Sequence, residues 1–304
     1  MAMRVATFAV SEQMITSALR TQSTMANQQI QEASGLISQD FGGLGATSQR
    51  VINLQVSVTR SQSYIDAANL ADSKVQVMYS AVGSMSDIIT KLRSLLTGAS
   101  LTSTTDSATV VQSAQDMMQQ MAGLLNTQYN GEYVFGGART DTAPVDLSDL
   151  TFTANPASAS TADTSYYQGD NQQASVRVSD SETVSFGVTA DNSAFEQTMR
   201  VLKLVANSSP LDSTTLNDAL TLASSALDAT SVVQTKLSNA ASAIETASSR
   251  QSDYQSFAKT LGTSLTDVDV AAVTAQLSTY QAQLTASYSA IAKIQGLNLA
   301  SYLR

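Results

Sequence analysis

The stretch VQVMYSAVGSMSDIITKLRSLL, residues 75–96, decides the fold class. Its large apolar side chains recur three and four positions apart, which places them along one face of an α-helix. A second apolar run, slightly offset in phase, begins at Val51 and precedes this stretch. Together the two runs predict one helix of about 70 Å, much longer than the ~11–12 residues typical of globular helices. The runs consist of Val51, Leu54, Val58, Ile65 and Ala68, and of Val75, Met78, Val82, Met85, Ile89, Leu92 and Leu96.

The C-terminal part of the chain has the same kind of pattern. One apolar stripe is expected to end near Gly262, and a second keeps heptad spacing with Ser287 as its one polar position. The segment between them, SLTDVDVAA, is typical of a helix start, because Ser or Thr can cap it and Asp267 and Asp269 favour the positive N-terminal end. The stripes consist of Leu216, Leu220, Ala223, Leu227, Val233, Leu237, Ile244, Ala247, Tyr254, Ala258 and Leu261, and of Val270, Val273, Leu277, Tyr280, Leu284, Ile291 and Ile294.

Two further helices are predicted in the N-terminal half. The first carries a sparse apolar stripe up to Gly35, and a glycine-rich loop or bent connection over residues 34–48 joins it to the long helix. The second covers roughly residues 106–129. Their stripes consist of Val5, Phe8, Ile15, Leu19 and Ile30, and of Val110, Ala114, Met117, Met121 and Leu124.

The middle of the chain departs from this helical pattern. NTQYNGEYVFGGARTDTAPV, residues 126–145, crowds aromatic residues, glycines and a proline together, whereas the first 143 and the last 94 residues contain no proline. From there to about residue 190, in YVFGG, ADTSYYQGDN, ASVRVSDS and ETVSFGVTA, the alternation is typical of short strands and turns. We therefore predict a small inserted β-rich module, with glycines that permit its turns and aromatic residues that anchor it. The junction residues are Tyr129, Gly131, Tyr133, Phe135, Gly136, Gly137 and Pro144.

The composition argues against several classes of function. The 304-residue chain has a net charge of −9, 13% charged residues, and neither Cys nor His. Nucleic-acid binding is not expected, because it needs clustered Lys and Arg. Thiolate catalysis, disulfides, zinc sites and imidazole acid–base chemistry are also not expected, and neither is a cofactor. The chain has no run of 18 apolar residues and no pattern of a cleaved signal peptide, so we expect neither membrane insertion nor signal cleavage.

The residues that could bind ligands have simpler explanations. Asp267 and Asp269 fit a helix start better than a metal site, and Asp40 fits a turn. GGLGATS, residues 42–48, lacks the lysine of a phosphate-binding loop. The methionines suit packing at helix seams. An enzyme in the β-rich module would have only the carboxylates of Glu132, Asp141, Asp163, Asp170 and Glu182, without a His or Cys partner.

Both ends of the chain carry thin apolar stripes. A helix of about 30 residues with such a stripe is not stable alone, because most helical stability comes from packing. We expect the two ends to pair and to bury their remaining apolar surface against other copies of the chain. The alternatives are an ordinary intramolecular bundle and a serine-rich, partly disordered linker protein.

Three long segments resemble the bacterial flagellin superfamily. They are MRVATFAVSEQMITSALRTQSTMANQQIQEASG (residues 3–35), RSQSYIDAANLADSKVQVMYSAVGSM (60–85) and SLTDVDVAAVTAQLSTYQAQLTASYSAIAKIQGLNLASYLR (264–304). Within this superfamily, residues 126–145 are similar to the corresponding segment of the hook-associated protein 3 family, which joins hook to filament. The turn GLISQDFGGLGATSQR, with Ser34 before it, lacks the basic, proline-containing, aspartate-rich pattern of the family. Some filament flagellins also carry a version of the segment at residues 126–145, so filament flagellin is the alternative.

The resemblance implies a mainly α fold, in which long paired terminal helices form a coiled-coil-like stem with a small inserted β-rich outer domain. It implies a structural axial subunit of the bacterial flagellum, exported unfolded by the type III apparatus without a cleaved signal peptide, and not an enzyme. A secreted helical effector is a more distant alternative. The implied partners are other copies, hook-associated protein 1 on the hook side, flagellin on the filament side, and an export chaperone.

The resemblance also implies a division of the chain. Residues 1–50 and 263–304 would form the inner tube, 51–130 and 191–262 the stem, and 131–190 the outer domain. We expect subunit packing to involve Phe8, Ile15, Leu54, Ile65, Val82, Val273, Leu277, Leu284, Ile291, Ile294, Leu297, Leu299 and Leu303.

Overall fold

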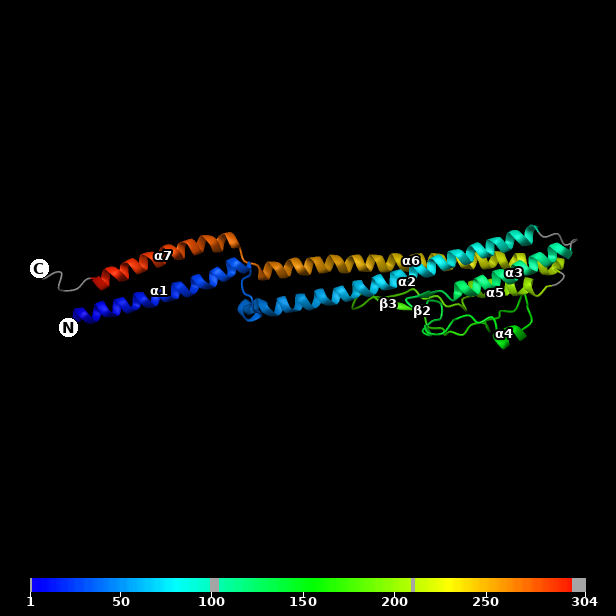
Figure 1. The fold of residues 1–304 in the computed structure, drawn as a ribbon, viewed down its shortest axis with the longest axis horizontal. Helices are drawn as coiled ribbons and strands as arrows, with labels where there is room; N and C mark the ends of the chain where they lie inside the picture. The colour runs from blue at the N-terminus through cyan, green and yellow to red at the C-terminus, as the bar shows by residue number, and fades with distance from the viewer. Residues whose placement is uncertain (1, 99–103, 209–210, 297–304) are drawn as a thin grey trace. The chain divides into compact units, whose positions relative to one another are not determined.

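The computed structural model describes residues 2–98, 104–208 and 211–296, and it is dominated by helices (Figure 1). The long helices are α1 (Ala2–Ser34), α2 (Ser48–Gly98), α6 (Ser213–Thr266) and α7 (Val270–Gly296). The shorter ones are α3 (Thr104–Leu125), α4 (Leu150–Ala154), α5 (Ser193–Ala206) and the 3-10 helix η1 (Phe41–Thr47). The predicted fold class, mainly α with long terminal helices and a small β insertion, is confirmed.

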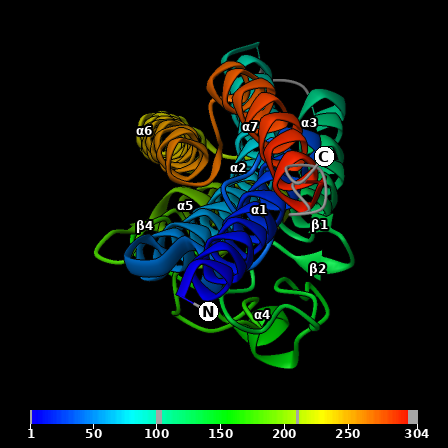
Figure 2. The same ribbon diagram turned by 90° about the vertical axis from the view of Figure 1, so that its left-hand side faces the viewer.

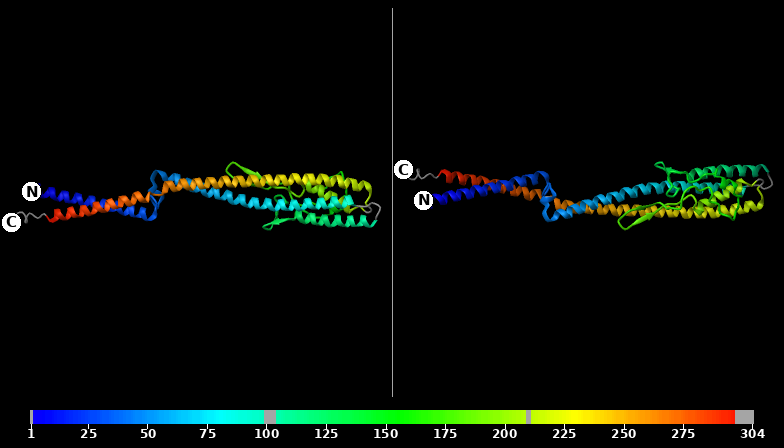
Figure 3. Two further views of the ribbon diagram at one scale, coloured as in Figure 1. Left: turned by 90° about the horizontal axis from the view of Figure 1, so that it is seen from above. Right: turned by 90° about the horizontal axis from the view of Figure 1, so that it is seen from below.

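The chain divides into two compact units. Unit 1 comprises Met1–Thr59 and Gln255–Arg304, and unit 2 comprises Arg60–Tyr254. In unit 1, α1 and α7 pack side by side, as both views of Figure 3 show. The two connections next to these helices form a short antiparallel bridge, in which Ile37 N donates to Thr266 O at 2.7 Å and Val268 N donates to Gly35 O at 3.0 Å. Gly35 has a φ of +70°, the left-handed conformation that commonly ends a helix.

Unit 2 contains the main hydrophobic core. All seven apolar residues of the stripe from Val75 to Leu96 are buried. They pack in one cluster with side chains from α3, α5 and α6, and α3 also packs against α5. The stripe is thus the core-facing side of α2, as its spacing predicts. Among the largest fully buried side chains of this cluster are Met78, Met85, Leu92, Met121, Phe135, Tyr166, Phe195 and Met199.

The segment between α3 and α5 contains two small hairpins. Strands β1 (Gln128–Tyr129) and β2 (Glu132–Tyr133) pair antiparallel, and β3 (Ser175–Arg177) pairs with β4 (Thr183–Ser185) in the same way. The β1–β2 turn places Asn130 and Gly131 at φ values of 52° and 82°, the conformation that two-residue hairpin loops need. Figure 2 shows α4 and the loops around it on one side of the helices of unit 2.

Three local predictions are wrong. Past Tyr133, YVFGG is not a strand, and ADTSYYQGDN contributes only an isolated bridge between Val145 and Tyr167. Their backbone groups bond to turns and to other loops instead. The helix expected to end near Gly262 continues to Thr266, because Gly262 is not in the left-handed conformation that ends helices. Helices α4 and α5 were not expected, although Asn192 caps α5 by accepting from Ala194 N at 3.1 Å.

Candidate assembly interface

In the described part of unit 1, exposed large apolar side chains outnumber buried apolar residues. Of the sixteen exposed large apolar side chains in the described part of the chain, eleven lie in unit 1. The forty-two residues of the main core all lie in unit 2, and only seven buried apolar residues lie in the described part of unit 1. A segment with more exposed large apolar side chains than buried ones is a candidate for packing against other molecules. The eleven are Val10, Ile15, Leu19, Ile30, Ile37, Phe41, Val56, Phe257, Leu261, Val270 and Tyr288.

The residues expected to make assembly contacts occupy different environments. Val273, Leu277 and Leu284 are buried within unit 1, Val82 is buried in the core of unit 2, and Ile15 is 40% exposed. Leu54, Ile65, Ile291 and Ile294 are half-buried. Phe8 falls within α1, but its side chain lies outside the described part of the chain, as do the residues Leu297, Leu299 and Leu303.

Polar side chains join α1 to α7 near the bridge of unit 1. Gln28 Nε2 donates to Gln276 Oε1 at 2.5 Å, and Thr274 Oγ1 donates to Glu32 Oε1 at 2.7 Å. Asp269 starts α7, since its carboxylate accepts from Ala272 N at 3.1 Å. These contacts fix the position of α7 along α1. The predicted helix start at Asp269 is confirmed, but the Ser or Thr cap is wrong, because Ser264 and Thr266 bond to carbonyls of α6.

The junction segment makes close backbone contacts with the loop at residues 166–170. Gly137 has a φ of +74°, and a Cβ at this position would overlap Asp170 Oδ1. The carboxylate of Asp170 accepts from Ala138 N at 2.9 Å, and backbone hydrogen bonds of this kind lower its pKa. A Cβ on Gly136 would lie 2.6 Å from Arg139 O. The two glycines are therefore needed where the backbone of the insertion passes close to itself.

Phe135 connects the junction segment to α5. Its fully buried ring packs edge-to-face on Phe195 at 5.7 Å between ring centres, and its carbonyl accepts from Ala190 N at 2.9 Å. Pro144 is buried, and its carbonyl accepts from Gln168 N at 2.9 Å. Tyr129, Gly131 and Tyr133 belong to the adjacent β1–β2 hairpin. The structure thus places the junction residues in two groups, one at the hairpin and one around Phe135.

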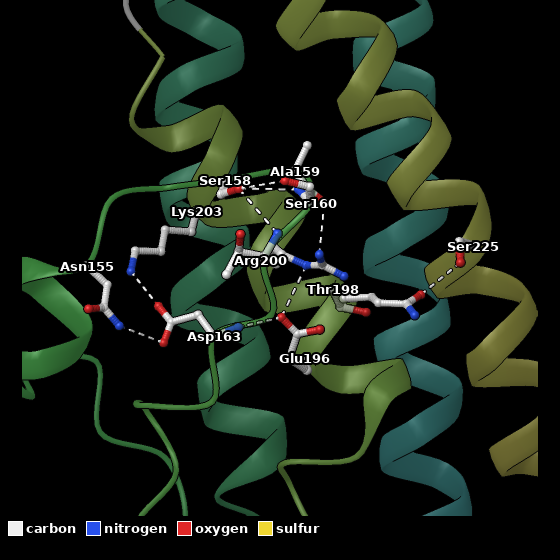
Figure 4. A network of polar contacts seen from close by, with 12 residues as sticks. Asn155, Ser158, Ala159, Ser160, Asp163, Glu196, Thr198, Arg200, Lys203 and Ser225 are labelled. Atoms are coloured by element: carbon white, nitrogen blue, oxygen red, sulfur yellow. Dashed lines mark hydrogen bonds and ion pairs between the residues drawn. The ribbon is translucent and has the colours of Figure 1, made fainter.

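A polar network on α5 was missed by sequence reasoning (Figure 4). Lys203 Nζ donates to Asp163 Oδ2 at 2.9 Å and to Phe152 O at 2.6 Å, and it lies 3.9 Å from the centre of the Phe152 ring. Burial by itself would raise the pKa of Asp163, but hydrogen bonds from Ser165 and Lys203 outweigh burial and lower that pKa to about 2. The network holds the loop before α5 against this helix.

A second pair on α5 extends this network. Glu196 Oε1 accepts from Asp163 N at 2.9 Å, and Arg200 Nε lies 3.2 Å from the same oxygen in ion-pair rather than hydrogen-bond geometry. Burial raises the pKa of Glu196, and the Asp163 N–H and the Arg200 guanidinium partly oppose that rise. Arg200 Nη1 also donates to Ala159 O at 2.8 Å. The only sequence signal for this network is the amphipathic stretch after the Asn192 cap.

Neither a metal site nor a membrane span is found in the part of the chain that the structure describes. Within residues 2–98, 104–208 and 211–296, no three carboxylates gather as metal binding would require. No helix over these same ranges is both long enough and apolar enough to cross a bilayer.

Comparisons with known proteins give one family match and several fold matches. Residues 5–140 match the family model of the bacterial flagellin N-terminal helical region. No curated protein matches the chain. A candidate flagellar hook-associated protein from Vibrio parahaemolyticus is similar in structure, with a TM-score of 0.59 and 15% identity, over 74% of this chain and 98% of that chain.

Two other solved structures are less similar. The flagellar hook-associated protein-3 of Legionella pneumophila gives a TM-score of 0.48 and 16% identity, over 71% of this chain and 97% of that chain. FlgL of Bacillus cereus gives a TM-score of 0.41 and 12% identity, over 72% of this chain and 98% of that chain. At 15% identity, the likeness to the Vibrio parahaemolyticus protein shows the fold alone. Over residues 5–140, this chain is similar to the N-terminal helical region of bacterial flagellin.

Proposed function

We propose that this chain is a structural axial subunit of the bacterial flagellum that connects the hook to the filament through helix–helix packing of its two ends. The observation that carries the proposal is the exposed apolar surface of unit 1, on the same chain that matches the flagellin N-terminal region. Fully burying one large apolar side chain contributes about 1.5–3 kcal/mol. Eleven partly exposed side chains therefore offer on the order of 10 kcal/mol per copy, before the entropy cost of association.

The proposal assigns separate tasks to the parts of the chain. The terminal segments, residues 1–50 and 263–304, form the inner tube. Residues 51–130 and 191–262 form the stem, and 131–190 form the outer domain. The packing residues are those named from the sequence except Val82, which is buried in the core of unit 2, with Leu297, Leu299 and Leu303 completing the inner contacts. The role is binding rather than catalysis, and no cofactor takes part.

The proposed partners follow from a place in an axial structure. Each copy packs against other copies, against hook-associated protein 1 on the hook side and against flagellin on the filament side. An export chaperone covers the apolar ends before export through the flagellar type III apparatus, without a cleaved signal peptide. The assembled protein is extracellular, on the flagellum. Nucleic acid and membrane insertion have no part in this role.

Filament flagellin is the second candidate. It is favoured by the family model itself, which describes the N-terminal region of flagellin. The connection over residues 35–50 lacks the basic, proline-containing turn usual in the family, so it does not single out the junction protein. The junction role is favoured by the likeness of residues 126–145 to the hook-associated protein 3 segment. Both candidates use the same terminal helices, so the distinction depends on where the protein lies in the flagellum.

Electron microscopy of flagella from cells that lack this protein tests the proposal. For a junction protein we expect hooks without filaments and unassembled flagellin in the culture medium. Missing filaments without flagellin in the medium would instead identify the filament subunit. Normal flagella, in cells without a second copy of the gene, would overturn both candidates. Restoring the gene on a plasmid is the control, because it should restore filaments.

A further inference from the structure

Within unit 1, the pair formed by the start of α2 and the end of α6 has a groove on one flank. The groove measures about 440 Å³ and has an apolar floor that includes Val51, Leu54, Val58 and Ala258. It is far larger than the roughly 30 Å³ that a water molecule occupies in the liquid. Gly262 also lines the groove, and a Cβ at this position would meet no atom within 4 Å. The groove is therefore open to a side chain of another molecule.

The opposite flank of the same helix pair carries an apolar ridge. Phe257 is 64% exposed and Leu261 is 39% exposed. Leu265 follows at the next turn of α6, and Leu261 and Leu265 line a smaller groove of about 280 Å³ on this flank. Leu54 lines both grooves, because it lies between the two helices.

Helical periodicity fixes which flank each residue occupies. Successive residues of an α-helix turn by about 100°. Phe257 is therefore rotated about 100° to one side of the buried Ala258, and Lys259 about 100° to the other. Phe257, Leu261 and Leu265 follow each other four residues apart on the first side, whereas Lys259 lines the groove on the second. The ridge and the groove of one copy consequently face away from each other.

This arrangement restricts how two copies can meet. A two-fold symmetric interface uses the same patch on both copies, so it cannot bring ridge onto groove when these lie on opposite flanks. A head-to-tail interface can, because each copy then offers its ridge to one neighbour and its groove to another. Phe257 and Gly262 are five residues apart, which corresponds to a shift of about 7.5 Å along the helix axis.

We infer that the Phe257–Leu261 ridge of one copy docks into the groove at Ala258 and Gly262 of a second copy of this chain. Charge complementarity supports another copy as the occupant. Asp253 lies one turn before Phe257 on α6, and Lys259 lines the groove, where its ammonium donates to Gln255 Oε1 at 2.9 Å. Docking brings these opposite charges toward each other at the rim. The inference rests on the proposed function for the identity of the partner and adds the contact surface and its polarity.

Disulfide trapping tests this contact, because the chain contains no cysteine of its own. The purified protein carries Phe257→Cys and Gly262→Cys together and is oxidised mildly over a series of concentrations. The two sulfurs cannot bridge within one copy, since the Cα atoms lie about 9 Å apart on one helix and their Cβ atoms diverge. We expect a ladder of disulfide-linked dimers, trimers and larger species. Phe257→Cys alone should stay monomeric, and a mixture of the two single variants should give dimers only.

A groove-filling substitution gives an independent readout. Gly262→Leu places a side chain in the groove, where its Cβ meets no atom of the same copy within 4 Å, and it should lower the yield of the Phe257→Cys and Thr263→Cys ladder about tenfold or more. The matched control is Gly123→Leu in α3, where a Cβ also meets nothing within 4 Å. This control should leave the ladder unchanged.

The possible results separate this inference from the proposed function. Efficient dimers of Phe257→Cys alone, or no linked species at any concentration, would overturn the ridge-to-groove contact even if cells lacking the protein have no filaments. A ladder that Gly262→Leu does not reduce would also overturn it. A ladder from purified protein, together with normal flagella in cells that lack it, would instead overturn the proposed flagellar role and leave the contact standing.

Discussion

Lys203 Nζ lies 2.9 Å from Asp163 Oδ2, and both side chains of this ion pair are largely buried, with exposed fractions of 7% and 15%. The pair joins α5 to a loop that is 40 residues earlier in the chain. Removing one partner of such a pair leaves an uncompensated charge in a poorly hydrated place, which is costly. The loop before α5 therefore depends on a contact that local sequence does not specify.

Lys203→Met should destabilise unit 2 by about 3 kcal/mol, because it leaves the Asp163 carboxylate buried without its cation. Urea unfolding measures the loss, and hydrogen exchange should show faster exchange at residues 149–165. Exposed Lys91→Met is the control and should change stability by less than about 0.5 kcal/mol. Equal effects of the two substitutions would show that the ion pair contributes nothing.

Stability should depend on pH through Asp163. Its pKa is 3.8 when unperturbed and about 2 in the folded chain, so its contribution is present above pH 3.8 and is lost as the pH falls toward 2. The size of this contribution is about 2 kcal/mol. Asp163→Asn removes the titrating group. The unfolding free energies of the parent chain and this variant should differ most above pH 3.8, and the difference should become smaller as the pH falls toward 2. A difference that does not change with pH would contradict the prediction.

Glu196 should have the opposite pH dependence, because burial raises its folded pKa above 4.5. A carboxylate with a raised pKa binds its proton more tightly in the folded state, so its contribution to stability increases as the pH falls through the folded pKa toward 4.5. Glu196→Gln should remove this increase. The comparison is made by urea unfolding between pH 7 and pH 4.5, where a variant curve parallel to the parent curve would exclude the effect.

The two glycines with positive φ in the junction segment should differ in their tolerance of alanine. Gly131→Ala meets open space, so it should cost only the strain of its φ of 82°, about 1 kcal/mol. Gly137→Ala adds an overlap with Asp170 and should cost at least about 2 kcal/mol more. Thermal unfolding of unit 2 distinguishes them. If both substitutions have the same cost, the close approach to Asp170 does not constrain the chain.

Leu284→Asp should prevent incorporation into the flagellum while unit 2 stays folded. Leu284 is 7% exposed within unit 1, so a carboxylate there must be buried or must separate its neighbours. Leu150→Asp in α4, at a position 85% exposed, is the matched control and should incorporate normally. Incorporation is measured by immunogold labelling of purified flagella. Normal labelling with Leu284→Asp would count strongly against assembly through the terminal helices.

Limited proteolysis of the monomer should remove the segments of unit 1 before it cuts unit 2. The reason is that, among the residues whose burial is described, unit 1 has seven buried apolar residues, whereas unit 2 contains the cluster of forty-two. Local opening is easiest where few apolar contacts are buried. Mass spectrometry of the fragments identifies the cut sites. Ends that resist digestion as long as the α2–α5 region does would favour an ordinary intramolecular bundle.

The sequence predicts the long helices well because each has its own periodic pattern. The spacing from Val75 to Leu96 identifies the buried side of α2, and Gly35 marks the end of α1. These features are local, since a helix is held by bonds between residues four apart and its buried side follows from 3.6 residues per turn. The turn at Asn130 and Gly131 is equally local, because two adjacent residues supply the conformations that it needs.

Other features depend on residues that are distant in the chain, and only the tertiary structure decides them. The ion pair of Lys203 with Asp163 and the ring contact of Phe135 with Phe195 both depend on the path of an irregular segment that has no periodic pattern. Gly262 looks like a helix end, yet α6 continues through it and the missing side chain becomes part of a groove. By itself the sequence determined the long helices, the buried face of α2 from Val75 to Leu96 and the lack of Cys and His side chains, because these depend on neighbouring residues or on composition. The tertiary structure decided which loop is held to α5, and which flank of the α2–α6 pair is ridge and which is groove, because these depend on how distant segments come together in space.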